Sequence, residues 1–334
     1  MKDLVIGDVH FGIKTNNISW LESQLKFFND QVLPLVPQHD RIIFLGDLFD
    51  VRYSVNEQVG VEVKNFVRKL SSYGKEVYFI AGNHDYYSPV VDFENYNAYE
   101  VVFGKEFEMI YKNIHFLTNS PLLDNNTLML PWYYTENEDR WLQMMHDYKN
   151  QFNTIYCHSD LASWNNEKIS SKGNSVVISG HIHYPYINED AGLYNVGACC
   201  SFTFNDVNSE RYIYTIENGQ ILNKYENVTT PKFYRYFNER IFTLTGDDLS
   251  NAYVQLCIST ENQSKARYIE KIKEIKYSYV DSNIKIITLD NDEITELLST
   301  ADMNTDIHQY IKNNIPDHLT TKYELLNQRL NDSI

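Results

Sequence analysis

The chain has 334 residues, of which 43% are hydrophobic, and its 45 acidic and 29 basic side chains give a formal net charge of −16 at pH 7. This length favours two domains with a core of ordinary size, and the charge argues against a protein that coats nucleic acid. No apolar run approaches about 18 residues, no signal-peptide pattern is present and the four cysteines form no CxxC pair, so we expect no membrane span, no disulfide framework and a reducing cytoplasm.

The first part of the chain alternates short apolar strands with amphipathic helices. Uncharged, apolar runs predict strands buried on both faces at residues 4–6, 42–45 and 77–81. Apolar residues at helical spacing predict helices over 17–32 and 55–72, with Ser19 as a possible cap of the first and Gly74 ending the second. Strands and helices in this order imply right-handed parallel crossovers.

Further strands follow, and the first two of them are expected in a second sheet. The apolar runs that predict them lie at residues 115–117, 128–130, 154–156 and 176–178. A helix over 138–148 is expected before the third. Two later strands, 211–216 and 220–225, flank Asn218-Gly219, which is a strong signal for a type I′ hairpin. We expect this domain to end near Pro231.

The remaining residues predict a small α/β unit and then two short helices. The small unit has strands at 253–258 and 284–289 around a helix over 263–276. Apolar stripes after a polar stretch predict the last two helices, over 306–314 and 317–330. Because isolated helices this short are marginal in water, we expect the pair to dock on a partner helix; the alternative is that the pair folds back on the small unit.

Side chains that are typical metal ligands follow five of the predicted strands, at the point where each strand ends. They are Asp8, His10, Asp47, Asn83, His158, His181 and His183. Because ligands of open α/β sheets bind beyond the carboxyl ends of the strands, we expect these seven side chains to meet. Seven nitrogen and oxygen ligands without a thiolate suit two ions of manganese, iron or zinc better than a structural zinc, and they are too rich in histidine for calcium or magnesium.

A pair of divalent ions about 3.5–4 Å apart is the usual apparatus for displacement at a phosphate ester. One carboxylate must lie between the two ions. Asp47 is the natural candidate for this bridging role, because its strand lies in the middle of the set.

The motifs Asp-x-His, Gly-Asp-x-x-Asp, Gly-Asn-His-Asp, a lone His and Gly-His-x-His occur in this order between Asp8 and His183. In this arrangement the chain resembles the calcineurin-like metallophosphoesterases. The spellings GDVHFG, GDLFDVR and GNHD are similar to one branch, the SbcD-type DNA double-strand-break repair nucleases, which include the recombination endonuclease subunits of tailed phages. Each motif alone is a weak signal, whereas all five in order are a specific one.

The resemblance implies an α/β fold in which two sheets form a metallophosphoesterase sandwich flanked by helices. A small α/β capping domain and a C-terminal helix pair follow the sandwich. The expected boundaries are 1–231 for the nuclease domain, 232–290 for the capping domain, and 291–334 for a linker with the helices that bind a partner.

The resemblance also implies a role for each candidate residue. One ion is expected on Asp8, His10 and His183, the other on Asn83, His158 and His181, with Asp47 bridging and manganese as the most suitable metal. His84 is the candidate catalytic acid, because its side chain should point away from that of its neighbour Asn83. Asp50 is expected to orient His84, as a carboxylate orients a catalytic histidine.

The function that the resemblance implies is a two-metal DNA nuclease, with exonuclease and endonuclease activity on duplex ends and single strands. Its partner would be an SMC-like ABC ATPase of the SbcC type, bound through the C-terminal helices. The chain has no GxxxxGK[ST] motif, so we expect the partner to hydrolyse ATP. A homodimer through the helices of the nuclease domain is also implied, and a phage-encoded protein would work in the host cytoplasm.

Two other classes of function stay open. A metallophosphoesterase could act on phosphoproteins or cyclic nucleotides, although GDxVDRG and GNHE, the motifs of protein phosphatases, are absent. A metal-free scaffold is disfavoured because all seven ligand positions are filled. Trp132, Tyr133 and the aromatic residues of 86–103 could stack on DNA, and those of 86–103 could instead form a dimer face, but packing is the favoured interpretation. Arg52 could contact a phosphate or lie free at the surface.

Overall fold

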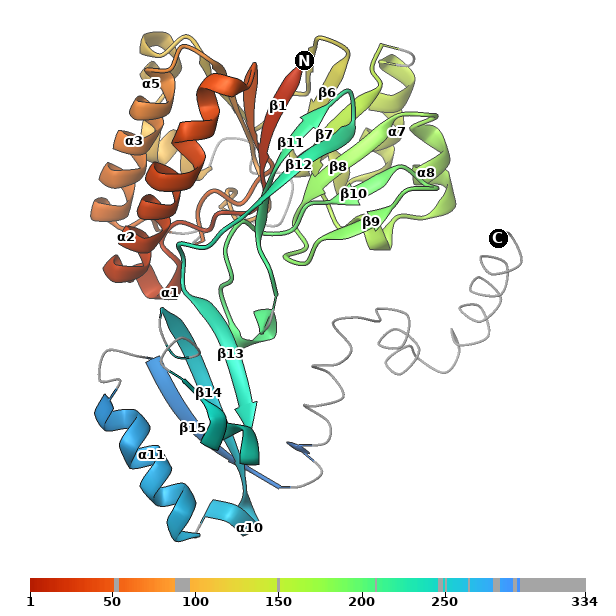
Figure 1. The fold of residues 1–334 in the computed structure, drawn as a ribbon. Coiled ribbons are helices and arrows are strands. Elements are labelled where there is room, and N and C mark those ends of the chain that lie inside the picture. Colours follow the sequence, from red (N-terminus) through yellow and green to blue (C-terminus); the bar gives the residue numbers. More distant parts are fainter. Residues whose placement is uncertain are drawn as a thin grey trace. The chain divides into compact units, whose positions relative to one another are not determined.

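The computed structural model describes residues 1–50, 54–87, 97–148, 151–207, 209–245, 249, 251–263, 265–278, 283–290 and 293–294 (Figure 1). The chain forms two compact units, one of Met1–Phe202 with Glu210–Pro231 and one of Thr203–Ser209 with the chain from Lys232 onward. The helices expected over 306–314 and 317–330 lie outside the described residues, and the three-part division of the chain stays a prediction. No helix among the described residues combines the length and the apolar character that crossing a membrane requires.

The first sheet of the larger unit has six strands in the order β12-β11-β1-β2-β3-β4. Its bounds are β1 (Lys2–Ile6), β2 (Arg41–Phe44), β3 (Glu76–Ile80), β4 (Ile114–Leu117), β11 (Tyr212–Glu217) and β12 (Gln220–Glu226). Strands β1 to β4 are parallel, and the hairpin β11–β12 joins them antiparallel along β1. The strands expected at 4–6, 42–45 and 77–81 are therefore confirmed as a parallel set.

The strand expected at 115–117 in the second sheet is β4 of the first sheet, so this part of the prediction was wrong. β4 pairs in parallel with β3, with Phe116 opposite Phe79. The ring of Phe116 stacks on those of Phe79 and Phe103, with centroids 5.3 and 4.5 Å apart. β4 is therefore a further parallel strand of the first sheet, and the Phe103 side chain of a helix before it packs on Phe116.

The second sheet also has six strands, in the order β5-β6-β7-β8-β10-β9. Its bounds are β5 (Leu122–Asp124), β6 (Thr127–Leu130), β7 (Thr154–His158), β8 (Val176–Gly180), β9 (Tyr186–Asn188) and β10 (Leu193–Asn195). Strands β6, β7, β8 and β10 are parallel, with antiparallel β5 and β9 at the edges.

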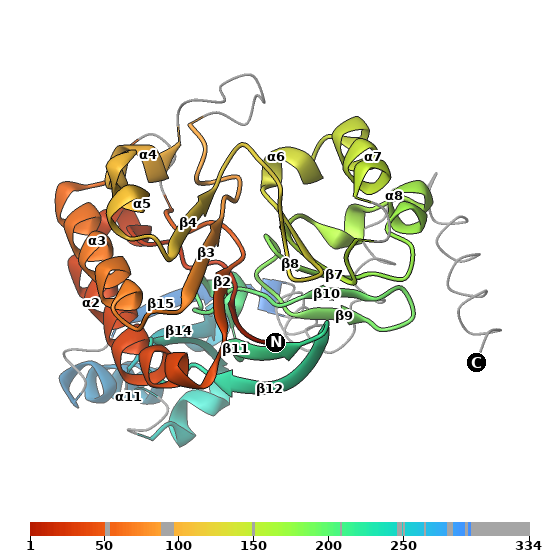
Figure 2. The ribbon, with the colours of Figure 1, turned by 90° about the horizontal axis from the view of Figure 1, so that it is seen from above.

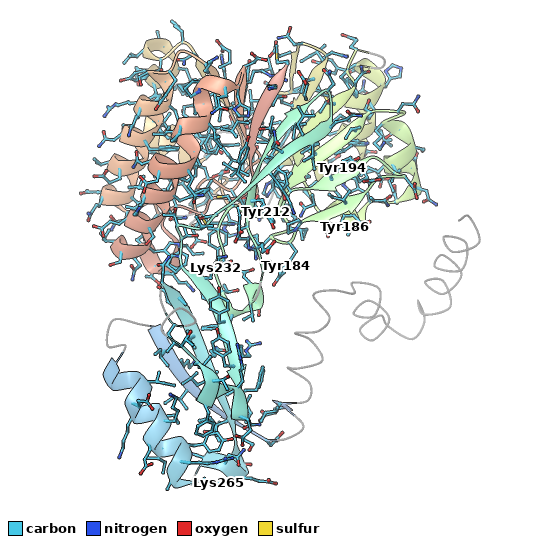
Figure 3. The ribbon with its side chains drawn as sticks, viewed as in Figure 1. Tyr184, Tyr186, Tyr194, Tyr212, Lys232 and Lys265 are labelled. Carbon is cyan, nitrogen blue, oxygen red and sulfur yellow. The ribbon has the colours of Figure 1, made fainter. Side chains whose placement is uncertain are left out.

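A buried core lies between the two sheets. Its side chains come from both of them and include Val5, Ile43, Tyr78, Met129, Tyr156, Ile178 and Ile216. The partly buried rings of Tyr194 and Tyr212, labelled in Figure 3, pack against it. This sheet-on-sheet packing confirms the predicted sandwich.

Helices cover the outer face of each sheet (Figure 2). On the first sheet these are α2 (Ile18–Phe27), α3 (Glu57–Ser71), α4 (Ala98–Phe103) and α5 (Glu106–Ile110); on the second they are α7 (Glu138–Asp147) and α8 (Asn166–Ser171), with α6 (Trp132–Thr135) before them. Asn17, and not the expected Ser19, caps α2 by accepting a hydrogen bond from the main-chain N–H of Trp20. Short helical segments are α1 (Ile13–Asn16), Phe28–Val32, Leu33–Gln38, Leu161–Ser163, Phe204–Asp206 and Asn238–Thr243.

The smaller unit contains a parallel three-stranded sheet in the order β13-β14-β15. Its bounds are β13 (Lys232–Phe237), β14 (Ala252–Ser259), α10 (Thr260–Gln263), α11 (Ala266–Ser278) and β15 (Asn283–Leu289). Val254, Leu256 and Ile258 of β14 pack with Tyr268 and Ile275 of α11 to form its core. Two of the three strands and the long helix were predicted; β13, which is made of four aromatic and two basic residues, was missed.

Candidate metal centre

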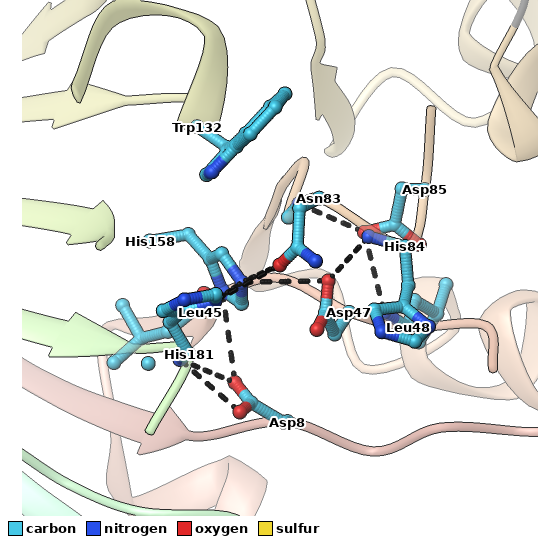
Figure 4. Close-up of polar contacts among 12 residues, drawn as sticks. Asp8, Leu45, Asp47, Leu48, Asn83, His84, Asp85, Trp132, His158 and His181 are labelled. Carbon is cyan, nitrogen blue, oxygen red and sulfur yellow. Dashed lines mark hydrogen bonds and ion pairs between the residues drawn. The ribbon is translucent and has the colours of Figure 1, made fainter. Parts of the chain in front are cut away.

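All seven side chains that the sequence selects as metal ligands lie together at the carboxyl ends of the parallel strands, and Figure 4 labels Asp8, Asp47, Asn83, His158 and His181 among them. Asp8 and His10 follow β1, Asp47 follows β2 and Asn83 follows β3, all from the first sheet. From the second sheet, His158 is the last residue of β7, and His181 and His183 follow β8. The strand ends of the two sheets therefore converge on one centre.

Glycines in these loops allow the ligand side chains to approach one another closely. A Cβ atom at Gly82 would overlap the Asp47 carboxylate, one at Gly180 would overlap that of Asp8, and one at Gly46 would overlap the ring of His158. The ligand residues carry backbone strain of their own, since φ is +52° at His10, +49° at Asp47 and +85° at His181. Strain of this kind is typical of functional sites.

One group of ligand atoms comes from Asp8, His10 and His183 and lies within 4.8 Å of one another. Nε2 of His10 and Nε2 of His183 are 3.2 Å apart, and Nε2 of His183 is 3.9 Å from the Asp8 carboxylate. These are the three residues expected on the first ion.

A second group consists of Asp47, His158 and His181. Nε2 of His158 and Nδ1 of His181 are 3.2 Å apart, and the side-chain oxygen of Asn83 lies 2.9 Å from each of them. The four residues therefore bring together one carboxylate oxygen, one amide oxygen and two imidazole nitrogens.

The Asp47 carboxylate lies between the two groups and faces both. Its Oδ1 is 3.4 Å from Nε2 of His158, and its Oδ2 is 3.6 Å from Nε2 of His10. Both Asp47 and His158 are almost completely buried. One carboxylate with an oxygen toward each cluster of nitrogens is the arrangement that a bridging ligand needs.

The donor set fits divalent cations. Two carboxylates, four imidazoles and one amide oxygen crowd into one site, of which only His181 and His183 are partly exposed, and buried anionic and lone-pair groups require compensating positive charge. Burial lowers the pKa of His158, but the Asp47 carboxylate raises this pKa by more than burial lowers it, to about 9. Burial conversely raises the pKa of Asp47, and His158, His10 and His84 together hold it far below the ordinary range. The positive charge of protonated His158 thus balances the negative charge of the Asp47 carboxylate, at the place where bound cations would supply positive charge.

His84 lies beside the centre, with its ring edge-to-face against that of His10. Its main-chain N–H donates to Oδ1 of Asp47 at 2.8 Å, and its Nδ1 hydrogen-bonds to the main-chain oxygen of Asp50 at 2.6 Å. From the sequence, we expected the carboxylate of Asp50 to orient the ring of His84. That carboxylate instead lies against His10, with Oδ1 3.4 Å from Nδ1 of His10, and it is the main-chain carbonyl group of Asp50 that meets His84.

Asp85 joins the loops that carry Asp47 and Asn83. Its fully buried carboxylate accepts hydrogen bonds from the main-chain N–H groups of Gly82 at 2.9 Å, Phe49 at 3.2 Å and Leu48 at 3.3 Å. The hydroxyl of Tyr99 in α4 donates to the same carboxylate at 3.0 Å. Asp85 therefore holds two ligand loops in register.

Two residues that the sequence did not single out hold the loop of His181 and His183. The side-chain NH₂ of Asn195 donates to the carbonyl oxygens of Ile182 and Tyr184, both at 2.6 Å. The buried guanidinium of Arg211 donates to the carbonyl oxygen of His183. No spacing pattern in the sequence connects either residue with the histidines.

The aromatic candidates divide into buried and accessible ones. Tyr133 is only 9% exposed and stacks under Arg140, whose guanidinium carbon is 3.6 Å from the ring centroid. Tyr99 and Phe103 are buried in the helical layer, whereas Trp132 is partly exposed beside the centre (Figure 4). Arg52, Phe93 and Tyr96 lie outside the described residues.

A sequence profile described as calcineurin-like phosphoesterase matches residues 1–185, more than half of the chain and the whole stretch that carries the seven ligands. The chain belongs to the calcineurin-like phosphoesterase family. This result confirms the family predicted from the motifs, and the protein is a phosphoesterase of a family that uses divalent metals.

Relatives of this phosphoesterase include a phage protein. The chain is 23% identical to "Exonuclease subunit 1" of Enterobacteria phage T4 over 352 aligned positions, which cover 99% of this chain and 98% of that protein. The crystal structure of the nuclease MPE of Pseudomonas putida aligns with 66% of this chain and 85% of that one, at 15% identity and a TM-score of 0.33.

Proposed function

We propose that this phosphoesterase is a two-metal DNA nuclease, with exonuclease and endonuclease activity, that works within a recombination or repair complex. The observation that carries the proposal is the position of Asp47, with one carboxylate oxygen toward each group of ligands. A single phosphoryl group held at such a pair of ions experiences both at once, which is the basis of two-metal phosphodiester hydrolysis.

Asp8, His10 and His183 would hold one ion, Asn83, His158 and His181 the other, and Asp47 both. Divalent ions bound there, manganese by preference, would polarise the phosphate and lower the pKa of a water molecule. Asp85, Asn195 and Arg211 keep the ligand loops in place, so little reorganisation is needed when the ions bind.

His84 would act as the catalytic acid. A carbonyl oxygen can only accept a hydrogen bond, so the contact with the main chain of Asp50 places a proton on Nδ1 of His84. In the doubly protonated form of the ring, Nε2 is then the nitrogen that can give its proton to the leaving oxygen of the phosphodiester, while Nδ1 keeps its own. A positioned histidine of this kind contributes about 10²–10⁴ in rate.

DNA is favoured as the substrate over phosphoproteins and cyclic nucleotides. The full-length similarity to a phage protein named as an exonuclease subunit supports a nuclease, and so do the spellings GDVHFG, GDLFDVR and GNHD. A metal-free scaffold is disfavoured because every ligand position carries a suitable donor atom.

The test is a substrate comparison with the purified full-length protein in manganese, magnesium or zinc. End-labelled linear duplex and single-stranded DNA should be cleaved in manganese, whereas a phosphopeptide and a cyclic nucleotide should be hydrolysed much more slowly. Elemental analysis of the same preparation should give two metal ions per chain. Faster hydrolysis of the phosphopeptide or the cyclic nucleotide would assign the site to that substrate, and a chain that binds no metal would leave only the scaffold.

The proposed complex includes an SMC-like ABC ATPase of the SbcC type, bound by residues 291–334, and a second copy of the chain. The word "subunit" in the name of the phage relative supports a complex, and the absence of a P-loop motif supports an ATPase partner. An ATPase could also provide the DNA grip that a chain with a net charge of −16 lacks. We place this complex in the cytoplasm, which is that of the host if a phage encodes it.

Truncation after Asn291 tests the partner proposal. The truncated protein should still cleave simple substrates with manganese but should lose both ATPase association and any stimulation by ATP. Co-purification of the truncated protein with the ATPase at full affinity would contradict it. Sedimentation that gives only a 39.3 kDa species at micromolar concentration would contradict the homodimer.

A further inference from the structure

Trp132 is held directly beside the proposed metal ligands by the main chain around it. The main-chain N–H of Trp132 donates to the carbonyl oxygen of Ala81 at 2.9 Å, just before the loop of Asn83. At the other end of α6, the hydroxyl of Thr135 donates to the carbonyl oxygen of His158 at 2.7 Å. Helix α6 therefore connects the ends of β3 and β7, and its first residue lies over Asn83 and His158 (Figure 4).

The indole of Trp132 differs from the other three tryptophans of the chain. Trp20, Trp141 and Trp164 are 2%, 0% and 7% exposed, whereas Trp132 is only partly buried. The indole N–H groups of Trp141 and Trp164 donate to serine hydroxyls, but that of Trp132 has no hydrogen-bond partner among the described residues. In Figure 4 the nitrogen end of this ring is the end nearer to His158 and His181.

Packing alone does not account for this arrangement. Tyr133, the next residue, is buried and anchors α6 against the guanidinium of Arg140, while one neighbouring ring, Tyr86, lies 5.9 Å from Trp132 at an angle of 44°. The large aromatic surface of Trp132 stays partly open to solvent next to the centre, with an unused donor. Such a surface suits a flat ligand that brings its own hydrogen-bond acceptors.

We propose that Trp132 stacks on a nucleobase beside the scissile phosphate and so holds the DNA strand over the two ions. The inference rests on the proposed nuclease function and adds a residue that recognises the substrate. Because every base offers a π face, stacking here would favour nucleic acid over other phosphodiesters without selecting a sequence.

Kinetics with a base-free substrate separate this role from a structural one. The substrates are oligo-dT and an oligonucleotide of the same length made of abasic residues, which has the same phosphates and no bases. Trp132→Ala should raise KM for oligo-dT at least about fivefold, the lower end of the range for a stacked base, and leave KM for the abasic strand unchanged. Trp132→Phe should keep most of the affinity, and Tyr133→Phe, on the same helix, should have the parameters of the wild type.

Fluorescence supplies a second measurement that does not depend on the folding of the alanine variant. Because the other three tryptophans are buried, oligo-dT should quench the emission of the wild-type protein and have little effect on that of Trp132→Phe. An equal loss on both substrates in Trp132→Ala, or oligo-dT binding without quenching, would overturn the inference while the nuclease proposal stands. If the wild-type protein cleaves neither strand in manganese, the proposed function fails and the inference fails with it.

Discussion

The main-chain oxygen of Asp50 and Nδ1 of His84 are joined by a hydrogen bond of 2.6 Å, while the carboxylate of Asp50 lies 3.4 Å from Nδ1 of His10. One residue thus serves two histidines with two different groups. The carbonyl fixes the proton of His84, and the carboxylate supports a proposed metal ligand, as second partners of ligating histidines generally do. The two contributions of Asp50 can be separated by mutation.

We predict that Asp50→Asn has only a small effect on the chemical step. The substitution keeps the main-chain carbonyl, so His84 keeps its orientation and kcat at saturating manganese should fall less than about tenfold. Where a carboxylate itself orients a catalytic histidine, the corresponding change costs about 10⁴ in kcat. His84→Ser is the matched comparison: it should retain both ions and lose about 10²–10⁴ in rate. A loss of 10³ or more in Asp50→Asn with full metal occupancy would show that the carboxylate is the orienting group.

Metal affinity should rise with pH between about pH 7 and 9. The pKa of His158 lies near 9 in the metal-free protein, because the attraction of the Asp47 carboxylate outweighs the effect of burial. A metal ligand must be deprotonated, so binding at neutral pH has to displace this proton. Manganese titrations by calorimetry, in buffers of different ionisation enthalpy, should therefore show proton release at pH 7 that disappears above pH 9. Metal affinity that is constant across this window would contradict the assignment of His158.

Without metal, the His158 imidazole makes the stability of the protein fall with rising pH, whereas metal affinity rises. The pKa of His158 is raised from 6.5 to about 9, so its contribution to the free energy of unfolding is fully present below pH 6.5 and is lost as the pH rises through about 9. In chelator, Tm should fall over this range, whereas the metal-loaded protein should not show this fall.

Arg211→Lys should weaken metal binding although Arg211 is not a ligand. A lysine keeps the charge but cannot reproduce the fork that reaches both the carbonyl oxygen of His183 and the hydroxyl of Ser201. Loss of second partners around a metal site typically costs 10–100-fold in affinity or activity. We expect an increase of that size in the manganese concentration for half-maximal activity, with kcat recovered at high manganese. A decrease in Tm without any change in metal dependence would make the role of Arg211 purely structural.

The ligand set could be predicted from the sequence because each ligand follows directly after a short apolar strand. Strand ends that share one edge of a sheet bring residues as far apart as Asp8 and His183 together without any knowledge of side-chain packing. The sandwich followed from the family resemblance. The prediction that β4 belongs to the second sheet was wrong because the sequence of an apolar strand does not identify its neighbouring strand. The contact of Phe116 with Phe79 and Phe103 favours the first sheet.

Residues that support the ligands could not be predicted, because their contacts depend on the folded backbone. Asn195 and Arg211 donate hydrogen bonds to main-chain carbonyl oxygens. Every residue has such an oxygen, so the type of the accepting residue does not predict the contact. The same holds for Asp50, whose orienting contact with His84 comes from a main-chain atom that every residue has. The contacts of Arg41, which joins the two sheets, could not be predicted for the same reason: it is only 3% exposed, and its guanidinium bonds to Asp3 of its own sheet and to Asp124 of the other.

The central claim is that Asp47 joins two metal ions into one nuclease centre, and the most direct test is cleavage of linear duplex DNA by wild-type protein and Asp47→Ala in manganese, with metal content measured on the same samples. The account predicts two ions per chain and chelator-sensitive cleavage for the wild type. For Asp47→Ala, properly folded by circular dichroism, it predicts loss of at least one ion and no detectable cleavage. Cleavage by Asp47→Ala at the wild-type rate would contradict the two-metal assignment.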